Sequence, residues 1–72
     1  MPTLQQHNPK AQEAKVAVEL TARQAAELFN LLKAEVDFGE GLSPALEGLL
    51  KELRRAAKAL GVAFREGYAH LK

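Results

Sequence analysis

The 72-residue chain contains no cysteine and no tryptophan, and its two histidines, His7 and His70, lie far apart. Disulfide bonds are therefore excluded, and a structural zinc site is not expected, because neither histidine has a cysteine or an acidic cluster beside it. The chain also lacks an apolar run approaching the roughly 20 residues that cross a bilayer, and it does not open with a charged segment followed by an apolar one. We therefore expect a cytoplasmic protein without membrane partner, metal or cofactor.

A chain of 72 residues offers little material for a core. It has room for one domain, and a single core of this size rarely supplies more than about 3–5 kcal/mol. Since no disulfide can reinforce it, we expect self-association to a dimer or a higher oligomer. The formal charge is only +1, but residues 43–72 carry six Lys/Arg against three Asp/Glu, whereas residues 1–42 carry four against six. The cationic half is expected to attract an acidic surface.

The first part of the chain divides into an arm and a strand. Residues 1–14 contain two prolines and four polar amides but only isolated large apolar groups, which predicts a flexible N-terminal arm. Residues 15–72 are expected to form a single small helical domain. At its start, Lys15 to Leu20 alternate between apolar and other residues, which predicts a short strand. A lone strand leaves its backbone unpaired, so the expected neighbour is the same strand of a second chain or the stretch after Gly61.

Two helices are predicted after this strand. Thr21 followed by Gln24 fits a capping box, so the first helix is expected to begin at Ala22. Ser43 and Pro44 predict the second start, with an N-cap serine and a proline at the first helical position. The apolar stripe of the first helix follows the helical repeat at Ala25, Leu28, Phe29, Leu32 and Val36.

The second helix is predicted to run from Pro44 to at least Leu60. It is expected to continue, or to restart with a kink, across Gly61 as far as Leu71, because a seven-residue apolar repeat stays in phase across the glycine. Gly61 could instead end the helix as its left-handed C′ residue, with a strand or a third helix after it. The expected fold is mainly α: a short strand followed by a helical hairpin with a long second helix. Because the first helix is shorter, part of the repeat would be uncovered, so we assign the repeat to an oligomer interface. Its residues are Leu46, Leu50, Leu53, Ala57, Leu60, Phe64 and Leu71.

A cationic stripe follows the same repeat on another face of the second helix. It is the candidate partner-binding site, for an acidic protein surface or for the phosphates of a nucleic acid. The simpler interpretation is a solvated helix face, with Glu47 and Lys51 as an ordinary i, i+4 ion pair. The stripe consists of Lys51, Arg54, Arg55, Lys58 and Arg65.

Residues for catalysis are scarce. Ser43 is expected to serve as a helix cap, and His70 has no acidic residue near it in the sequence to orient its ring. The sequence therefore predicts a non-enzymatic, self-associating helical module, a small adaptor or inhibitor that presents a basic helix face to an acidic macromolecule.

The order of elements from Lys15 to Leu60 supports an alternative function. A short alternating strand, an N-capped helix, a turn containing Gly41-Leu42-Ser43 and a second amphipathic helix resemble the ribbon-helix-helix DNA-binding family. The resemblance implies a dimeric transcriptional regulator whose paired strands enter the major groove and turn Lys15, Ala17 and Glu19 toward base edges. It ranks second because Lys15 is the one cation that the ribbon would bring to the DNA.

Overall fold

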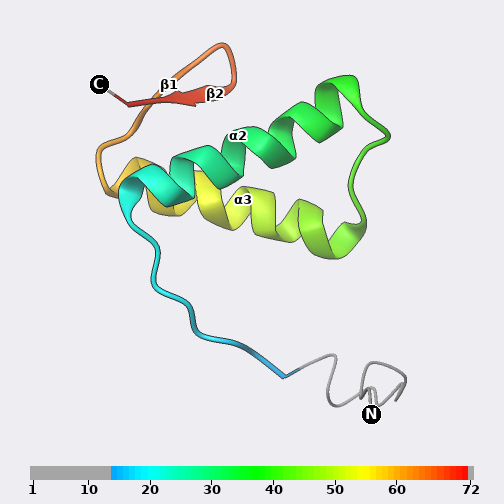
Figure 1. The fold of residues 1–72 in the computed structure, drawn as a ribbon, viewed down its shortest axis with the longest axis horizontal. Helices are drawn as coiled ribbons and strands as arrows, with labels where there is room; N and C mark the ends of the chain where they lie inside the picture. Colours follow the sequence, from blue (N-terminus) through cyan, green and yellow to red (C-terminus); the bar gives the residue numbers. More distant parts are fainter. Residues whose placement is uncertain (1–13, 72) are drawn as a thin grey trace.

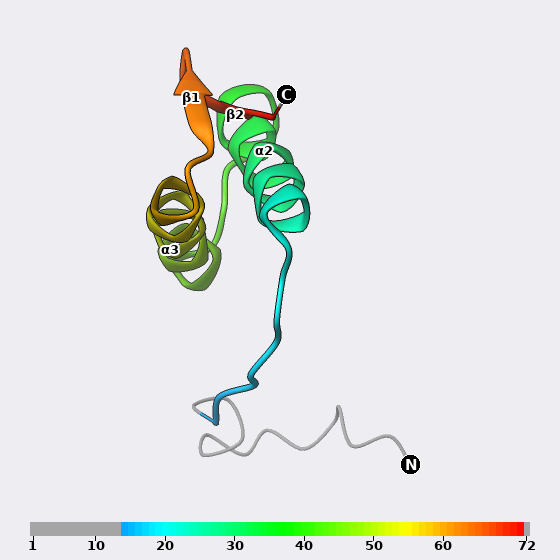
Figure 2. The ribbon, with the colours of Figure 1, turned by 90° about the vertical axis from the view of Figure 1, so that its left-hand side faces the viewer.

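The computed structural model describes residues 14–71, so the arm expected over residues 1–14 lies outside the described residues except for Ala14. The described chain is mainly helical: two helices form an antiparallel hairpin (Figure 1), and a short two-stranded antiparallel sheet covers one side of the helix pair (Figure 2). A mainly α fold with a helical hairpin is thus confirmed. The elements are α2 (Ala22–Phe38), α3 (Pro44–Ala59), β1 (Ala63–Arg65) and β2 (Tyr68–His70).

Both helices begin where the capping signals predict. The Gln24 amide N–H donates to Thr21 Oγ1 over 3.0 Å, and the Thr21 amide donates back to Gln24 Oε1 over 2.9 Å, which completes the capping box of α2. Ser43 caps α3, because its hydroxyl accepts from the Leu46 amide over 3.3 Å, and Pro44 occupies the first turn. Each side chain satisfies an amide that has no partner inside its own helix.

The prediction that the second helix continues through Gly61 is wrong. Gly61 has φ 92°, a left-handed conformation that favours glycine. The Val62 amide donates to the Ala57 carbonyl and the Gly61 amide donates to the Lys58 carbonyl, both over 3.0 Å. This pair of bonds is the Schellman arrangement that ends helices, and its usual apolar contact is available because Ala57 and Val62 are both buried. The alternative, a strand after Gly61, is correct.

The two strands form a hairpin with a two-residue turn. Phe64 pairs with Ala69 and Arg65 with Tyr68, and the turn between them is Glu66-Gly67. Both turn residues have positive φ, 56° and 89°, as the type I′ turn requires and as suits the twist of the strands.

The strand predicted over residues 15–20 is not formed in this single chain. Residues 14–20 are an exposed segment outside any helix or strand, and they run away from the helices on the side opposite the hairpin (Figures 1 and 2). The physical reason is the absence of a neighbour: the strands that do form, β1 and β2, pair with each other within the described residues.

The core lies where α2, α3 and the hairpin meet, and it is small. Phe29 is its one large fully buried side chain within residues 14–71, 2% exposed, and its ring meets that of Phe64 edge to face with centroids 5.2 Å apart. Such aromatic pairs add about 0.5–1.5 kcal/mol beyond the burial of their area. Four of the seven buried residues are alanines, which bury little apolar area each. The seven are Ala25, Ala26, Phe29, Leu53, Ala57, Val62 and Ala69.

A polar side chain of α2 fixes the hairpin to this core. Asn30 donates from Nδ2 to the Ala69 carbonyl over 3.0 Å and accepts the Ala69 amide at Oδ1 over 2.8 Å. In a hairpin with a two-residue turn, the second residue pair from the turn directs its backbone groups away from the partner strand. Ala69 belongs to that pair, so Asn30 satisfies the outer edge of β2 as a further strand would.

Candidate interaction surface

The cationic face is built by the helical repeat of α3. Lys51, Arg54, Arg55 and Lys58 occupy positions i, i+3, i+4 and i+7, which brings them to one side of the helix. All four are exposed, and together they line an open depression of about 440 Å³. We call these four residues the cationic face.

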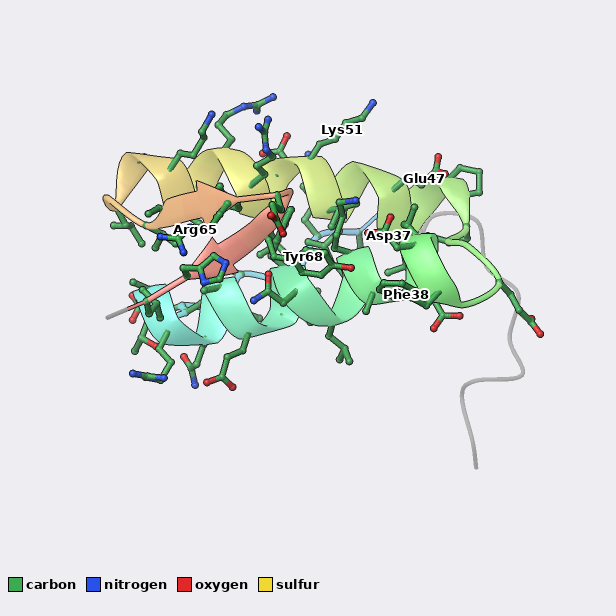
Figure 3. The ribbon with its side chains drawn as sticks, turned by 90° about the horizontal axis from the view of Figure 1, so that it is seen from above. Asp37, Phe38, Glu47, Lys51, Arg65 and Tyr68 are labelled. Atoms are coloured by element: carbon green, nitrogen blue, oxygen red, sulfur yellow. The ribbon has the colours of Figure 1, made fainter. Side chains whose placement is uncertain are left out.

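A second set of helically spaced residues, which are apolar, forms the side of α3 that faces the core. Leu53 and Ala57 are buried and Leu50 is partly buried against the core. Because these residues pack inside the chain, α3 cannot rotate, and its cations are held at the surface. In Figure 3, Lys51 points outward from α3, away from α2.

Few acidic groups neutralise the cationic face. Arg55 Nη1 lies 3.1 Å from Glu52 Oε2, in a pair whose two side chains are 74% and 67% exposed. Within residues 14–71, no carboxylate lies within 4.0 Å of Lys51, Arg54 or Lys58. The ion pair expected between Glu47 and Lys51 is therefore not formed. The guanidinium of Arg54 lies instead over the Phe64 ring, 5.7 Å from its centroid.

The prediction that Arg65 belongs to the same cationic face is wrong. It lies on β1, because α3 ends at Ala59, and Figure 3 places it on the hairpin while Lys51 points away from the outer side of α3. The helical spacing that aligned Arg65 with the other cations does not apply beyond Gly61, because the left-handed conformation of Gly61 ends the helix before Arg65.

The seven residues assigned to an oligomer interface are separated by the same break. Leu53 and Ala57 are buried within the chain, Leu50 packs partly buried against them, and Phe64 joins the core from β1. These four therefore contribute to the core of a single copy. Leu46, Leu60 and Leu71 remain exposed. Their part in contacts between chains stays a prediction.

A cluster of three polar side chains beside the hairpin was not anticipated from the sequence. The Lys33 ammonium donates to both oxygens of Asp37, over 2.9 and 3.0 Å, and the Tyr68 hydroxyl donates to Asp37 Oδ2 over 2.8 Å. Figure 3 shows Tyr68 reaching toward Asp37. The Lys33 ammonium also lies 5.6 Å from the centroid of the Tyr68 ring. Only the i, i+4 spacing of Lys33 and Asp37 signals part of this cluster in the sequence.

The hydrogen bonds of this cluster change two pKa values. The bonds from Lys33 and from Tyr68 lower the pKa of Asp37 from its ordinary value. Partial removal from water, together with the bond to the Asp37 carboxylate, raises the pKa of Tyr68. The cluster therefore holds Asp37 charged and Tyr68 neutral, as a joint between α2 and β2.

Ser43 and His70, the residues considered for catalysis in the sequence, occupy separate elements of the fold. Ser43 is engaged as the cap of α3, and His70 is exposed at the end of β2. Within residues 14–71, no three His, Cys, Asp or Glu side chains are grouped to hold a metal ion. Neither described helix has the length and apolar character needed to cross a membrane.

Comparisons of this chain with protein-family models, with curated proteins and with solved structures find no match. The function must therefore be inferred from the chemistry of its surfaces.

Proposed function

We propose that this protein is a non-enzymatic, self-associating interaction module whose cationic face binds an acidic protein surface. The observation that carries the proposal is the set of four exposed cations on one side of α3, of which only Arg55 has a carboxylate partner within the described residues. The module acts as a small adaptor or inhibitor: it occupies an acidic surface without transforming it.

The electrostatics of the cationic face favour such a partner. Lys51 and Arg54 are like-charge neighbours at i, i+3, and so are Arg55 and Lys58. Two further pairs, Lys51 with Arg55 and Arg54 with Lys58, are neighbours at i, i+4. Each such pair costs roughly 0.2–0.5 kcal/mol on an isolated helix. An acidic partner would remove this repulsion and add attraction, so binding at this face is favoured over binding elsewhere on a chain whose net charge is only +1.

An acidic protein fits better than a single-stranded nucleic acid because, among the described residues, no aromatic ring beside the cationic face is free to stack on a base. Single-stranded nucleic acids are bound by stacking bases on aromatic rings beside cationic groups. Phe64, the ring nearest to the cationic face, is partly buried and packs against Phe29. The exposed ring of Phe38 lies on α2, at the end of that helix.

The decisive test reverses two charges of the cationic face. Wild-type protein and the double variant Arg54→Glu with Arg55→Glu would be used as baits in extract of the native host treated with nuclease. We expect the wild type to retain an acidic protein and the double variant to lose it. Helicity should be unchanged, since surface substitutions usually move stability by less than about 0.5 kcal/mol. Retention of the same partner by the double variant would refute the proposal.

Two single substitutions provide a matched control. Lys51→Glu and Arg23→Glu each reverse one exposed charge, the first on the cationic face and the second on α2, where Arg23 lies 3.6 Å from Glu27. Only Lys51→Glu should weaken binding of the acidic protein. An equal loss of binding in both variants would mean that binding depends on the total charge of the protein and not on this face.

Repeating the pull-down in extract without nuclease tests the alternative function, a dimeric ribbon-helix-helix-like DNA-binding regulator. That function would make Lys15→Ala, and not the double arginine variant, abolish binding, and the captured partner would be DNA that nuclease removes. Duplex binding would also weaken with salt by roughly 0.9 log unit per log unit of salt for each phosphate neutralised.

A further inference from the structure

The segment before α2 carries a row of apolar side chains without an intrachain contact surface. Val16 is 87% exposed and Val18 is 72% exposed. Among the described residues, no hydrogen bond joins the backbone of residues 15–20 to another segment. Exposed β-branched residues next to unpaired backbone groups are the features of a strand that awaits a partner.

This segment is complementary to itself in one antiparallel register. When two copies of Lys15-Val16-Ala17-Val18-Glu19 are centred on Ala17, Lys15 of each copy lies opposite Glu19 of the other. In the same register Val16 lies opposite Val18, so apolar residues share one face and opposite charges share the other. Both kinds of cross-strand pair are stabilising.

Neighbouring registers lose this complementarity. A shift that pairs odd-numbered with even-numbered residues puts Lys15 opposite Val18, which mixes charged and apolar residues on both faces. Centring the pair on Val16 or on Val18 keeps the faces but separates Lys15 from Glu19. The register centred on Ala17 is thus the one that satisfies both faces.

We propose that residues 15–19 pair with the same residues of a second copy, as an antiparallel two-stranded ribbon centred on Ala17. This inference rests on the proposed self-association and names the element that produces it. It does not depend on the cationic face.

The hairpin of a second copy is a poorer partner for this segment. Its strands β1 and β2 have three residues each, and Asn30 already binds the outward backbone groups of Ala69 on β2. The capping box, in contrast, holds Thr21 in an extended conformation, with φ −72° and ψ 165°, directly after the segment. Part of the ordering that a ribbon requires is therefore already present where it joins α2.

Charge exchange tests the register. Lys15→Glu and Glu19→Lys each turn two symmetry-related attractive pairs into repulsive ones, and each should weaken dimerisation by roughly thirtyfold in sedimentation equilibrium. The double variant, which carries both changes, should dimerise within about threefold of the wild type, because it restores the pairs. An equimolar mixture of the two single variants should form heterodimers equally well.

Cross-linking gives an independent measurement on the full chain, which has no natural cysteine. Ala17→Cys should oxidise to a disulfide-linked dimer, because residue 17 faces itself across the ribbon. Ala14→Cys is the matched control: its two copies would lie about 20 Å apart along the ribbon, too far for a direct disulfide.

The outcomes distinguish this inference from the proposed function. Single variants that dimerise as well as the wild type, or a mixture that dimerises no better than its components, would overturn the ribbon while leaving self-association intact. A wild type that stays at 7.9 kDa at millimolar concentration would refute self-association itself. Arg54→Glu with Arg55→Glu should dimerise normally, since these residues lie outside the ribbon; a monomeric double variant would place the contact on α3 and overturn the inference.

Discussion

Asn30 is expected to contribute more to the stability of this fold than any of its surface ion pairs. Its side chain makes two hydrogen bonds to the backbone of Ala69, a residue that is only 7% exposed. Truncation of Asn30 therefore leaves the nearly buried N–H and C=O of Ala69 unpaired. Losing a partner in this way costs about 1–3 kcal/mol per group, with water relieving part of it at a half-buried site. Alanine returns roughly 0.5 kcal/mol through its higher helix propensity. We expect Asn30→Ala to cost about 2 kcal/mol.

That loss is large for a domain of this size. A cost of about 2 kcal/mol corresponds to a melting temperature lower by roughly 8–16 °C. Urea unfolding followed by circular dichroism would measure the free energy, and the fluorescence of Tyr68, the one tyrosine in a chain without tryptophan, would report the hairpin separately. Leu31→Ala is the matched control on α2, because Leu31 is 68% exposed and its loss should change stability by less than about 0.5 kcal/mol.

Asn30→Asp should make the stability depend on pH, because of the two hydrogen bonds between residue 30 and Ala69. The carboxylate can still accept the Ala69 amide, but its second oxygen faces the Ala69 carbonyl without a proton to donate. The folded state should therefore raise the pKa of this carboxyl above about 3.9. Its stabilising contact is then present below that value and is lost as the pH rises through the higher folded pKa. Asn30→Ala within about 0.5 kcal/mol of the wild type, with unchanged Tyr68 fluorescence, would refute the reasoning.

Two further predictions concern the core and the polar joint. Leu53→Ala should cost about 2–5 kcal/mol in urea unfolding, because Leu53 is 5% exposed between α2 and α3; a change below about 0.5 kcal/mol would contradict the assigned helix phase. The lowered pKa of Asp37 contributes stability that is present above its ordinary value of 3.8 and is lost as the pH falls through the folded value. NMR titration should find this pKa depressed and closer to 3.8 in Tyr68→Phe, and an unchanged value there would contradict the hydrogen bond from Tyr68.

The helix starts could be predicted from the sequence because capping is a local interaction. Thr21 and Gln24 satisfy each other's backbone within one turn, and Ser43 does the same for the Leu46 amide. No distant contact competes with these bonds. The burial of Ala25 and Phe29 followed equally from the helical repeat, since only one side of α2 can face α3 and the hairpin.

The end of α3 could not be predicted from the apolar repeat, because burial does not specify the backbone that achieves it. Phe64 is in phase with Leu60 on a continued helix, but it reaches Phe29 from a strand instead. The turn at Glu66-Gly67 gives a weaker signal than Asn-Gly or Asp-Gly would. The contact of Asn30 with Ala69 could not be predicted from the sequence, because Ala69 is 39 residues away and contributes only backbone atoms.

This correction changes the size of the candidate site. With α3 ending at Ala59, the cationic face extends only from Lys51 to Lys58, about 10 Å along the helix axis at 1.5 Å per residue. Four cations can neutralise at most about four phosphates, which limits the salt dependence of any duplex binding to roughly 3.6 log units per log unit of salt. A face this short suits a compact cluster of carboxylates.

Self-association would compensate for so short a face. The proposed ribbon uses residues 15–19 and the cationic face uses α3, so the two surfaces do not compete for the same residues. A dimer joined through the ribbon would carry two cationic faces on one particle. If an acidic partner offers two clusters within reach, the second contact forms at a high effective concentration, and the combined affinity exceeds that of one face by about 10² to 10⁴. Charge exchange at Lys15 should then weaken partner binding as well, although Lys15 lies outside the cationic face, because the monomer retains only a single face.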